Sequence, residues 1–370
     1  MRKLLSFVLF TGSVLYAGHS SAFGQKPGDK DEVIRVDTQL VDVPIAVVDA
    51  KGMPVRGLKQ NNFVVYEDGK AQDIADFSTT TEPFEVALLL DTSGSTRNDL
   101  PLIQRAASDF IAGLRPGDRV SIISFNTDRS GPTPAAVSEV LCPLTDDRKA
   151  LAVALQRVQV SNGTPYYDGL LQIAEKVFKD KPGEAYRGRR AMVALTDGVD
   201  SSSVADFASA KSELADEQII SYFIKVDTQD FFEESLTGDC STATQFSKAQ
   251  IRRYYRSVAM KGNAERAVSF CDLGDFERLA ISKKLYEIAD TEMGDISKSS
   301  GGRMFPVADL SEARGAFKSV ADDLGTKYTL GYYPSNDKRD GTFRKIRIEI
   351  KGLPTGTRVT AREGYTAPNQ

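Results

Sequence analysis

Histidine is almost absent from this chain of 370 residues, whose one histidine, His19, lies inside a stretch typical of a removable leader. A mature protein without the leader would have no histidine. A Ser-His-Asp or Cys-His hydrolase and a histidine-ligated zinc centre are therefore excluded by the residue inventory. Nucleophilic catalysis by a serine would need an unusual base such as lysine, and no lysine stands at motif spacing.

Long hydrophobic runs are also missing beyond the N-terminus. The leader has Arg2 and Lys3, an apolar run over residues 4–17 and the small residues Ser-Ser-Ala at 20–22. This pattern predicts a secretory signal peptide over residues 1–22. Its apolar core is shorter than the roughly 20 residues that a membrane span needs, although an uncleaved anchor is the alternative. No cysteine lies near the cleavage site, which argues against a lipoprotein. We expect a secreted or periplasmic protein without a membrane span.

Basic runs and cysteines are scarce. The formal net charge is −4 and no polybasic run stands out, so nucleic acid is not an expected partner. The chain has 3 cysteines. Because an exported chain lives in an oxidising compartment, we expect a disulfide between Cys240 and Cys271, although three cysteines permit other pairings. Cys142 is then left over, and we interpret it as a buried apolar residue rather than a reactive thiol.

Three short polar pieces carry the clearest functional signal: Asp-Thr-Ser-Gly-Ser at 91–95, Gly-Thr-Pro at 163–165 and Leu-Thr-Asp-Gly at 195–198. The first and third follow the continuous apolar runs 84–90 and 191–195, which are typical of strands buried on both faces of a parallel sheet. Loops at the carboxyl ends of such strands are where open α/β sheets bind their ligands. We therefore expect the three pieces to meet at one edge of the sheet.

The side chains in these pieces are hard oxygen donors without thiol or imidazole. Such donors select Mg²⁺, Mn²⁺ or Ca²⁺ over zinc or copper. In Asp-x-Ser-x-Ser the three side chains are two residues apart, so they can converge on one ion. The glycine between the serines permits a sharp turn of the loop. The predicted metal ligands are Asp91, Ser93, Ser95, Thr164 and Asp197.

Simpler interpretations exist for each piece alone. Asp and Ser favour ordinary turns and helix caps, and Thr-Pro often starts a helix. Asp168 falls in the first turn of the next helix, where the helix dipole favours a carboxylate. Asp200 can be interpreted as an ordinary loop residue. A phosphatase with Asp91 as nucleophile is an enzymatic alternative, but such sites usually contain Asp-x-Asp, and here Ser93 occupies the second position.

Together, Asp-x-Ser-x-Ser, the distant threonine and the strand-terminal Thr-Asp-Gly resemble the metal-ion-dependent adhesion site (MIDAS) of von Willebrand factor type A domains. The resemblance implies a doubly wound sheet with helices on both faces. It also implies direct coordination by Ser93, Ser95 and Thr164, with Asp91 and Asp197 binding directly or through water. A carboxylate from a ligand would complete the shell.

The pattern along the chain predicts an α/β domain inserted into a small β-sandwich. Apolar and polar residues alternate with a period of two over residues 33–82 and 327–370, which predicts β-strands in both segments. Each segment is too small to be stable alone, so we expect the two segments to pair into one β-sandwich. Alternating strands and amphipathic helices predict an α/β, Rossmann-like domain with a mostly parallel sheet over residues 83–326, and the resemblance described above implies that this is a von Willebrand factor A domain. Residues 23–32 are expected to form a flexible tether.

Residues 227–275 depart from a minimal type A domain and are predicted to be an insertion near the metal face. This segment has little apolar content, so the expected disulfide would stabilise it. Its role could be partner recognition or that of a solvated loop.

The overall arrangement resembles that of integrin β subunits. More closely, Leu-Gly-Tyr-Tyr-Pro at 330–334 and Arg-Glu-Gly-Tyr at 362–365 resemble exported von Willebrand factor A-related proteins of Acidobacteria.

The sequence therefore predicts a non-enzymatic, metal-dependent binding protein of adhesion type. Its partner would be a protein that presents an Asp or Glu carboxylate to the cation. The alternative from another class is a structural envelope protein whose metal is liganded internally, for example by Asp230 or Glu233.

Overall fold

The computed structural model describes residues 40–51, 53–79, 82–93, 99–258, 269–353 and 355–369. The predicted signal peptide (1–22), the predicted tether (23–32) and Ser95 lie outside the described residues. Within the described part of the chain, no helix is long and apolar enough to cross a membrane.

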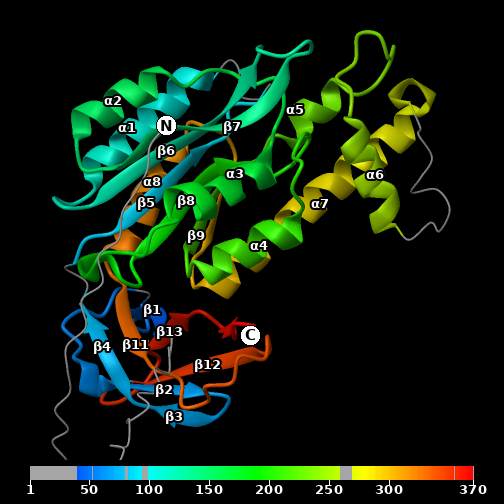
Figure 1. Ribbon diagram of the computed structural model, residues 1–370. Helices are drawn as coiled ribbons and strands as arrows, with labels where there is room; N and C mark the ends of the chain where they lie inside the picture. The colour runs from blue at the N-terminus through cyan, green and yellow to red at the C-terminus, as the bar shows by residue number, and fades with distance from the viewer. Residues whose placement is uncertain are drawn as a thin grey trace, which may run out of the picture. The chain divides into compact units, whose positions relative to one another are not determined.

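A six-stranded sheet forms the centre of the α/β domain (Figure 1). All neighbouring strands run parallel except the edge strand β7, which is antiparallel to β6. In spatial order the strands are β10 (Met304–Val307), β9 (Ile220–Val226), β8 (Arg190–Thr196), β5 (Glu85–Leu90), β6 (Arg119–Asp128) and β7 (Ala135–Thr145). Because β5 lies between β8 and β6, the loops after β5 and β8 are adjacent at one edge.

Alternation along β5 divides the core into two layers. Val86, Leu88 and Leu90 belong to one cluster of buried side chains, whereas Ala87 and Leu89 belong to the other. Strand side chains alternate between the two faces, so a strand buried on both sides must be apolar at every position. This requirement explains the continuous apolar run that the sequence shows.

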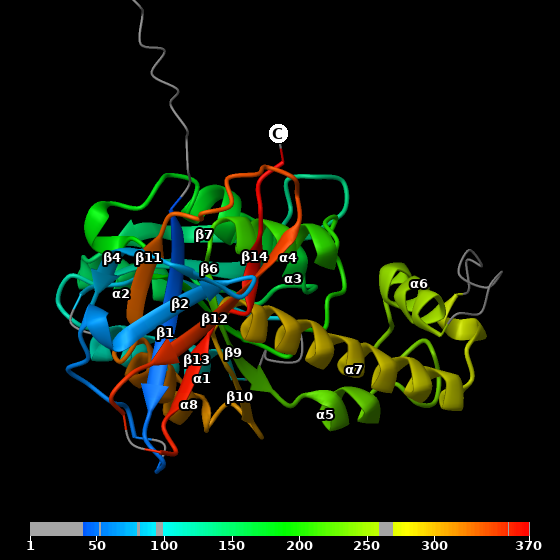
Figure 2. The same ribbon diagram turned by 90° about the horizontal axis from the view of Figure 1, so that it is seen from below.

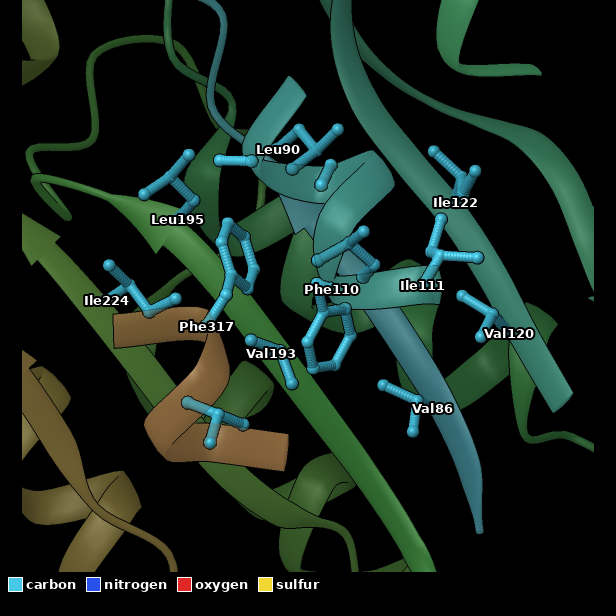
Figure 3. Close-up of a cluster of buried hydrophobic side chains, with 14 of the residues drawn as sticks. Val86, Leu90, Phe110, Ile111, Val120, Ile122, Val193, Leu195, Ile224 and Phe317 are labelled. Atoms are coloured by element: carbon cyan, nitrogen blue, oxygen red, sulfur yellow. The ribbon is translucent and has the colours of Figure 1, made fainter. Parts of the chain in front are cut away.

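Helices cover both faces of the sheet. The first layer includes Phe110 and Phe317, whose ring centroids are 5.1 Å apart (Figure 3). Its helices are α1 (Leu100–Gly113), α2 (Arg148–Gln156) and α8 (Ala313–Leu324). The second layer is formed by α3 (Tyr166–Gln172), the π-helical turn η3 (Ile173–Val177), α4 (Phe207–Asp216) and the second half of α7 (Asp275–Ser300). The predicted doubly wound fold is confirmed.

The two ends of the chain build a β-sandwich of two four-stranded sheets. β1 (Val41–Val48) pairs with β11 (Tyr328–Tyr332) and with β13 (Arg358–Ala361), and β11 also pairs with β4 (Ile74–Ser78). In the second sheet, β12 (Phe343–Ile350) pairs with β2 (Phe63–Glu67) and with β14 (Gly364–Thr366), and β2 forms a hairpin with β3 (Lys70–Gln72). Figure 2 labels β1, β2 and β4 from the N-terminal segment and β11, β12, β13 and β14 from the C-terminal segment. The predicted sandwich is confirmed, while the residue boundaries given above for the domains stay predictions.

A buried polar network links the two sheets of the sandwich. Glu67 accepts hydrogen bonds from the hydroxyl groups of Tyr332, at 2.7 Å, and Tyr365, at 3.0 Å. Arg344 forms an ion pair with the same carboxylate, with an N–O distance of 3.5 Å, and both charged side chains are buried. A buried charge needs both a partner and hydrogen bonds. The C-terminal tyrosines therefore have a structural role here.

Buried cations also join the sandwich to the α/β domain. Arg189 is fully buried and donates hydrogen bonds to the backbone oxygens of Thr79, Glu82, Pro83 and Lys327. The chain passes between the two domains twice, once before β5 and once before β11. Arg189 hydrogen bonds to both of these connecting segments and so links them.

The predicted insertion folds around a hydrophobic cluster of its own. We call residues 229–258 and 269–285 the arm; it contains α5 (Gln229–Glu234), α6 (Lys248–Ser257) and the first half of α7. Cys240 and Cys271 form a disulfide, as expected. The expectation of little apolar content in residues 227–275 was wrong, because this segment buries Leu236, Phe246, Ile251, Tyr255, Phe270 and Leu273; Ile281 and Leu285 of α7 complete the cluster.

Candidate metal centre

Asp91 stands directly after β5, in a loop fixed by the neighbouring strand. Its backbone N–H donates to Leu195 O at 2.9 Å, which continues the pairing of β5 with β8. Its carboxylate accepts hydrogen bonds from Ser93 N at 3.0 Å and from the Thr196 hydroxyl at 2.7 Å. Asp91 and Ser93 are both buried. The loop thus holds one carboxylate and one hydroxyl residue close together.

Asp197 follows β8 on the adjacent strand. Its Oδ1 accepts a hydrogen bond from Val199 N at 2.9 Å, and its Oδ2 accepts one from the Thr228 hydroxyl at 2.6 Å. Gly198 has a φ of +74°, which glycine adopts without strain, and a Cβ there would lie 2.8 Å from the terminal carbon of Met293. A close approach of α7 therefore requires the glycine of Thr-Asp-Gly.

Asp91 and Asp197 line one small cavity together with Thr196 and Thr228. Both carboxylates are buried, and burial raises the pKa of each. For Asp197 the pKa rises to about 7, chiefly through burial and secondly through the charge of Asp91, while the Thr228 hydrogen bond acts in the opposite direction. Two buried carboxylates so close together favour either a shared proton or a cation.

Thr164 lies on a loop that hydrogen bonds to both other loops. Thr164 N donates to the Ser201 hydroxyl at 2.8 Å, and Ser201 N donates to Thr164 O at 3.0 Å. Ser161 N donates to Thr92 O at 2.8 Å. The structure therefore brings the loops that carry four of the five candidate residues to one edge of the sheet. The fifth candidate, Ser95, is outside the described residues.

The donor set suits a hard divalent cation. It combines two carboxylates with threonine and serine hydroxyls, and these oxygen ligands are preferred by Mg²⁺ and Ca²⁺. Among the described residues, no group of three or more His, Cys, Asp or Glu side chains is arranged for metal binding. A site here would therefore depend on hydroxyl oxygens as well as on the carboxylates.

Asp168 and Asp200 serve the loops around the candidate centre. Asp168 accepts hydrogen bonds from the backbone N–H groups of Val204 and Ala205. Asp200 accepts from Tyr166 N at 3.0 Å, bonds to Ser203 and forms an ion pair with Arg253. Asp200 thus fixes the backbone two residues after Thr164, and Asp168 fixes the neighbouring loop at Val204 and Ala205.

Two neighbours of the centre were not predicted from the sequence. Thr228 lies just after β9, the next strand in the sheet, in the same way that Asp91 and Asp197 lie just after β5 and β8. This position after a buried strand is the sequence signal from which Thr228 could have been predicted. Its hydroxyl also lies 2.8 Å from the Tyr286 hydroxyl on α7. Arg253 comes from the arm, and no pattern in the sequence indicates that it reaches Asp200.

Residues 86–199 match the family model of the von Willebrand factor type A domain. The chain contains a von Willebrand factor type A domain. The match begins in β5 and ends just beyond Asp197, so it includes all the candidate metal ligands. No curated protein matches the chain.

Several solved structures are similar to this chain at low identity. A von Willebrand factor type A protein from Catenulispora acidiphila is 13% identical, with a TM-score of 0.42 over 90% of this chain and 64% of that one. An aerotolerance-related membrane protein from Bacteroides fragilis is 18% identical, with a TM-score of 0.39 over 65% and 98%. Proximal thread matrix protein 1 from the mussel byssus, with a zinc-occupied MIDAS motif, is 14% identical, with a TM-score of 0.39 over 65% and 48%.

Proposed function

We propose that this chain is a non-enzymatic protein that binds a carboxylate of a partner protein through a divalent cation. Mg²⁺ is the proposed ion, with Mn²⁺ and Ca²⁺ as close substitutes. The observation that carries the proposal is the buried pair of Asp91 and Asp197 at the ends of β5 and β8. The proposed ligands are Asp91, Ser93, Ser95, Thr164 and Asp197.

Each loop contributes a different part of the proposed site. Asp91 and Asp197 supply the negative charge that holds the ion, and their hydrogen bonds to Thr196 and Thr228 fix the directions of the carboxylates. The hydroxyl residues add neutral donors, so the cation would keep enough positive charge to attract a carboxylate from outside. Thr164 is tied to the Ser201 loop through its backbone, which leaves its hydroxyl for coordination.

The proposed location is outside the cytoplasm, either secreted or periplasmic. The signal-peptide pattern of residues 1–22 supports it. The disulfide between Cys240 and Cys271 also supports it, because such bonds persist in oxidising compartments. Membership in the exported Acidobacterial group stays a proposal based on the C-terminal motifs.

An internally liganded, structural metal centre is the second candidate. Its support is the Thr228 hydrogen bond, because α5 starts at the next residue and carries Asp230 and Glu233. Glu233 accepts a hydrogen bond from Gln229 on the same helix at 2.8 Å, so it would have to exchange this contact for the metal. This alternative predicts metal-dependent stability without a partner.

The test is affinity capture of envelope and secreted proteins on the immobilised chain from residue 23 onward, in Mg²⁺ or in EDTA. Thr164→Ala removes one hydroxyl donor, whereas Thr164→Ser retains it and is the matched control. We expect one partner to be retained by the wild type and by Thr164→Ser in Mg²⁺, and lost with Thr164→Ala or EDTA.

The same capture pattern under all conditions would contradict the proposal. Metal-dependent thermal stability combined with metal-independent capture would favour the structural alternative. Mapping the retained partner by Asp and Glu substitution then tests whether a carboxylate is the group recognised.

A further inference from the structure

We propose that α6 is a second contact surface for the partner of the metal centre, and that this partner is a protein segment with several acidic residues. One carboxylate would reach the metal, and the neighbouring ones would contact the basic side of α6. The inference rests on the proposed function and specifies the chemistry of the partner.

The charge of α6 carries the first step. The helix contains Lys248, Arg252, Arg253 and Arg256 and no acidic residue, in a chain whose formal net charge is −4. Lys248, Arg252 and Arg256 are four residues apart, which places them along one side of the helix. All three are exposed, and none has an ion-pair partner among the described residues. They form a basic stripe available to an acidic partner.

The position of α6 carries the second step. The fourth cation, Arg253, lies 3.7 Å from Asp200 Oδ2, and its guanidinium is 4.6 Å from the centre of the Tyr167 ring. Asp200 accepts a hydrogen bond from Tyr166 N, two residues after Thr164. Arg253 therefore connects α6 to the loop that carries the Thr164 hydroxyl, and Arg252, the middle residue of the basic stripe, is its neighbour in the sequence.

The arm holds α6 in a fixed orientation. Ile251 and Tyr255 are buried in the hydrophobic cluster of the arm, so the opposite side of α6 is left for the solvent. The Tyr255 hydroxyl hydrogen bonds to Glu277 on α7, and the disulfide joins the segments before and after α6. A preformed basic surface loses little conformational freedom when a partner binds.

An exposed apolar residue favours a polypeptide as the partner over an inorganic polyanion. Val204 is 97% exposed, and its backbone N–H is held by Asp168 in the loop beside Thr164. A polypeptide has apolar groups that can contact such a side chain, whereas a phosphate polymer has none.

Two fluorescent peptides separate the contribution of α6 from that of the metal. The first is Gly-Ser-Asp-Ser-Gly, with a single acidic residue, and the second has the same sequence followed by four glutamates. Binding is measured by fluorescence anisotropy in Mg²⁺ and in EDTA, at low and moderate NaCl concentrations. Inorganic polyphosphate serves as the non-protein polyanion.

Two charge-reversed variants differ only in where the charges lie. The control cations are three exposed lysines at the end of η3 and just beyond it, at positions 176, 179 and 181. The α6 variant carries Lys248→Glu, Arg252→Glu and Arg256→Glu, and the control variant carries Lys176→Glu, Lys179→Glu and Lys181→Glu.

We expect the wild type in Mg²⁺ to bind the glutamate-rich peptide about tenfold more tightly than the single-Asp peptide, since exposed ion pairs are individually weak. The α6 variant should lose this preference, with unchanged binding of the single-Asp peptide, and the control variant should keep it. The preference should also decrease as NaCl rises.

Equal binding of the two peptides by the wild type, or equal losses in both variants, would overturn the role of α6 and leave the metal proposal standing. Metal-independent binding of the glutamate-rich peptide that is lost only in the α6 variant would contradict the shared site. Tighter binding of polyphosphate than of the peptide would overturn the protein partner. Absence of Mg²⁺-dependent binding of either peptide would contradict both proposals.

Discussion

Asp42 provides a pH-dependent prediction about the joint between the two domains. It lies on β1 and is buried, and its backbone N–H donates to the Gln218 side chain of the α/β domain at 2.9 Å. One carboxylate oxygen, Oδ1, has no hydrogen-bond partner among the residues that the structure describes. Burial raises the pKa of Asp42 from 3.8 to about 7, although Arg187 and Arg362 act in the opposite direction.

The sign of the effect follows from proton linkage. The folded state binds this proton more tightly than the unfolded state, so the stabilising contribution is complete below pH 3.8 and is lost as the pH rises to about 7. A difference of about three pKa units corresponds to roughly 4 kcal/mol as an upper limit. Asp42→Asn removes the titration and should therefore stabilise the protein at pH 8 but hardly at pH 4.

The assay is urea unfolding of the wild type and Asp42→Asn between pH 5 and pH 8.5. We expect the difference in the free energy of unfolding to change by about 2 kcal/mol in favour of the variant across this range. Groups that titrate equally in both proteins cancel in this difference. A difference that stays constant with pH would refute the reasoning.

Three further predictions concern other parts of the molecule. Thr228→Val removes the hydroxyl that donates to Asp197, the second carboxylate of the proposed metal centre, and should weaken Mg²⁺ binding about tenfold in calorimetry; unchanged affinity would contradict that role. Replacing Cys240 and Cys271 by serine opens a loop of sequence separation 31 and should make the arm sensitive to limited proteolysis while the α/β domain stays resistant; equal resistance of both would count against it. Arg344→Met leaves Glu67 buried without its cation and should lower the free energy of unfolding by about 3 kcal/mol in urea; a neutral effect would show that the ion pair is dispensable.

The sequence was sufficient to predict the central sheet and the sandwich. Apolar runs such as 84–90 and 191–195 are local signals, and each determines where a strand ends and its loop begins. The sandwich could be predicted because neither terminal segment is large enough to be stable alone, so the two segments have to pair. β1 and β11 are far apart in the sequence, yet they pair as this requirement demands.

The arm could not be predicted in the same way. Ile281, Leu285, Ala289 and Met293 recur every fourth residue and indicate a helix, but they pack into two different clusters. The length of α7 and its role in joining the arm to the α/β domain therefore depend on tertiary packing. Its C-terminal glycine, Gly301, has a φ of +77°, a helix-ending signal that the sequence did contain.

Buried charges were the least predictable feature. Arg189 and Lys327 would be assigned to the surface from their residue type, yet both are fully buried at the joint between the domains. Lys327 is stabilised by Asp323 at 3.2 Å and by the backbone oxygen of Gly301 at 2.8 Å. Such roles depend on which backbone carbonyls the fold brings together, and this information is spread over the whole chain.

The most direct test of the proposed metal centre is calorimetric titration of Mg²⁺ into the metal-free chain from residue 23 onward, with Asp91→Asn in parallel. One ion bound per wild-type chain, with binding lost or strongly weakened in the variant, is the predicted result. A wild-type chain that binds no divalent cation, or that binds it equally well with Asp91→Asn, would contradict the account.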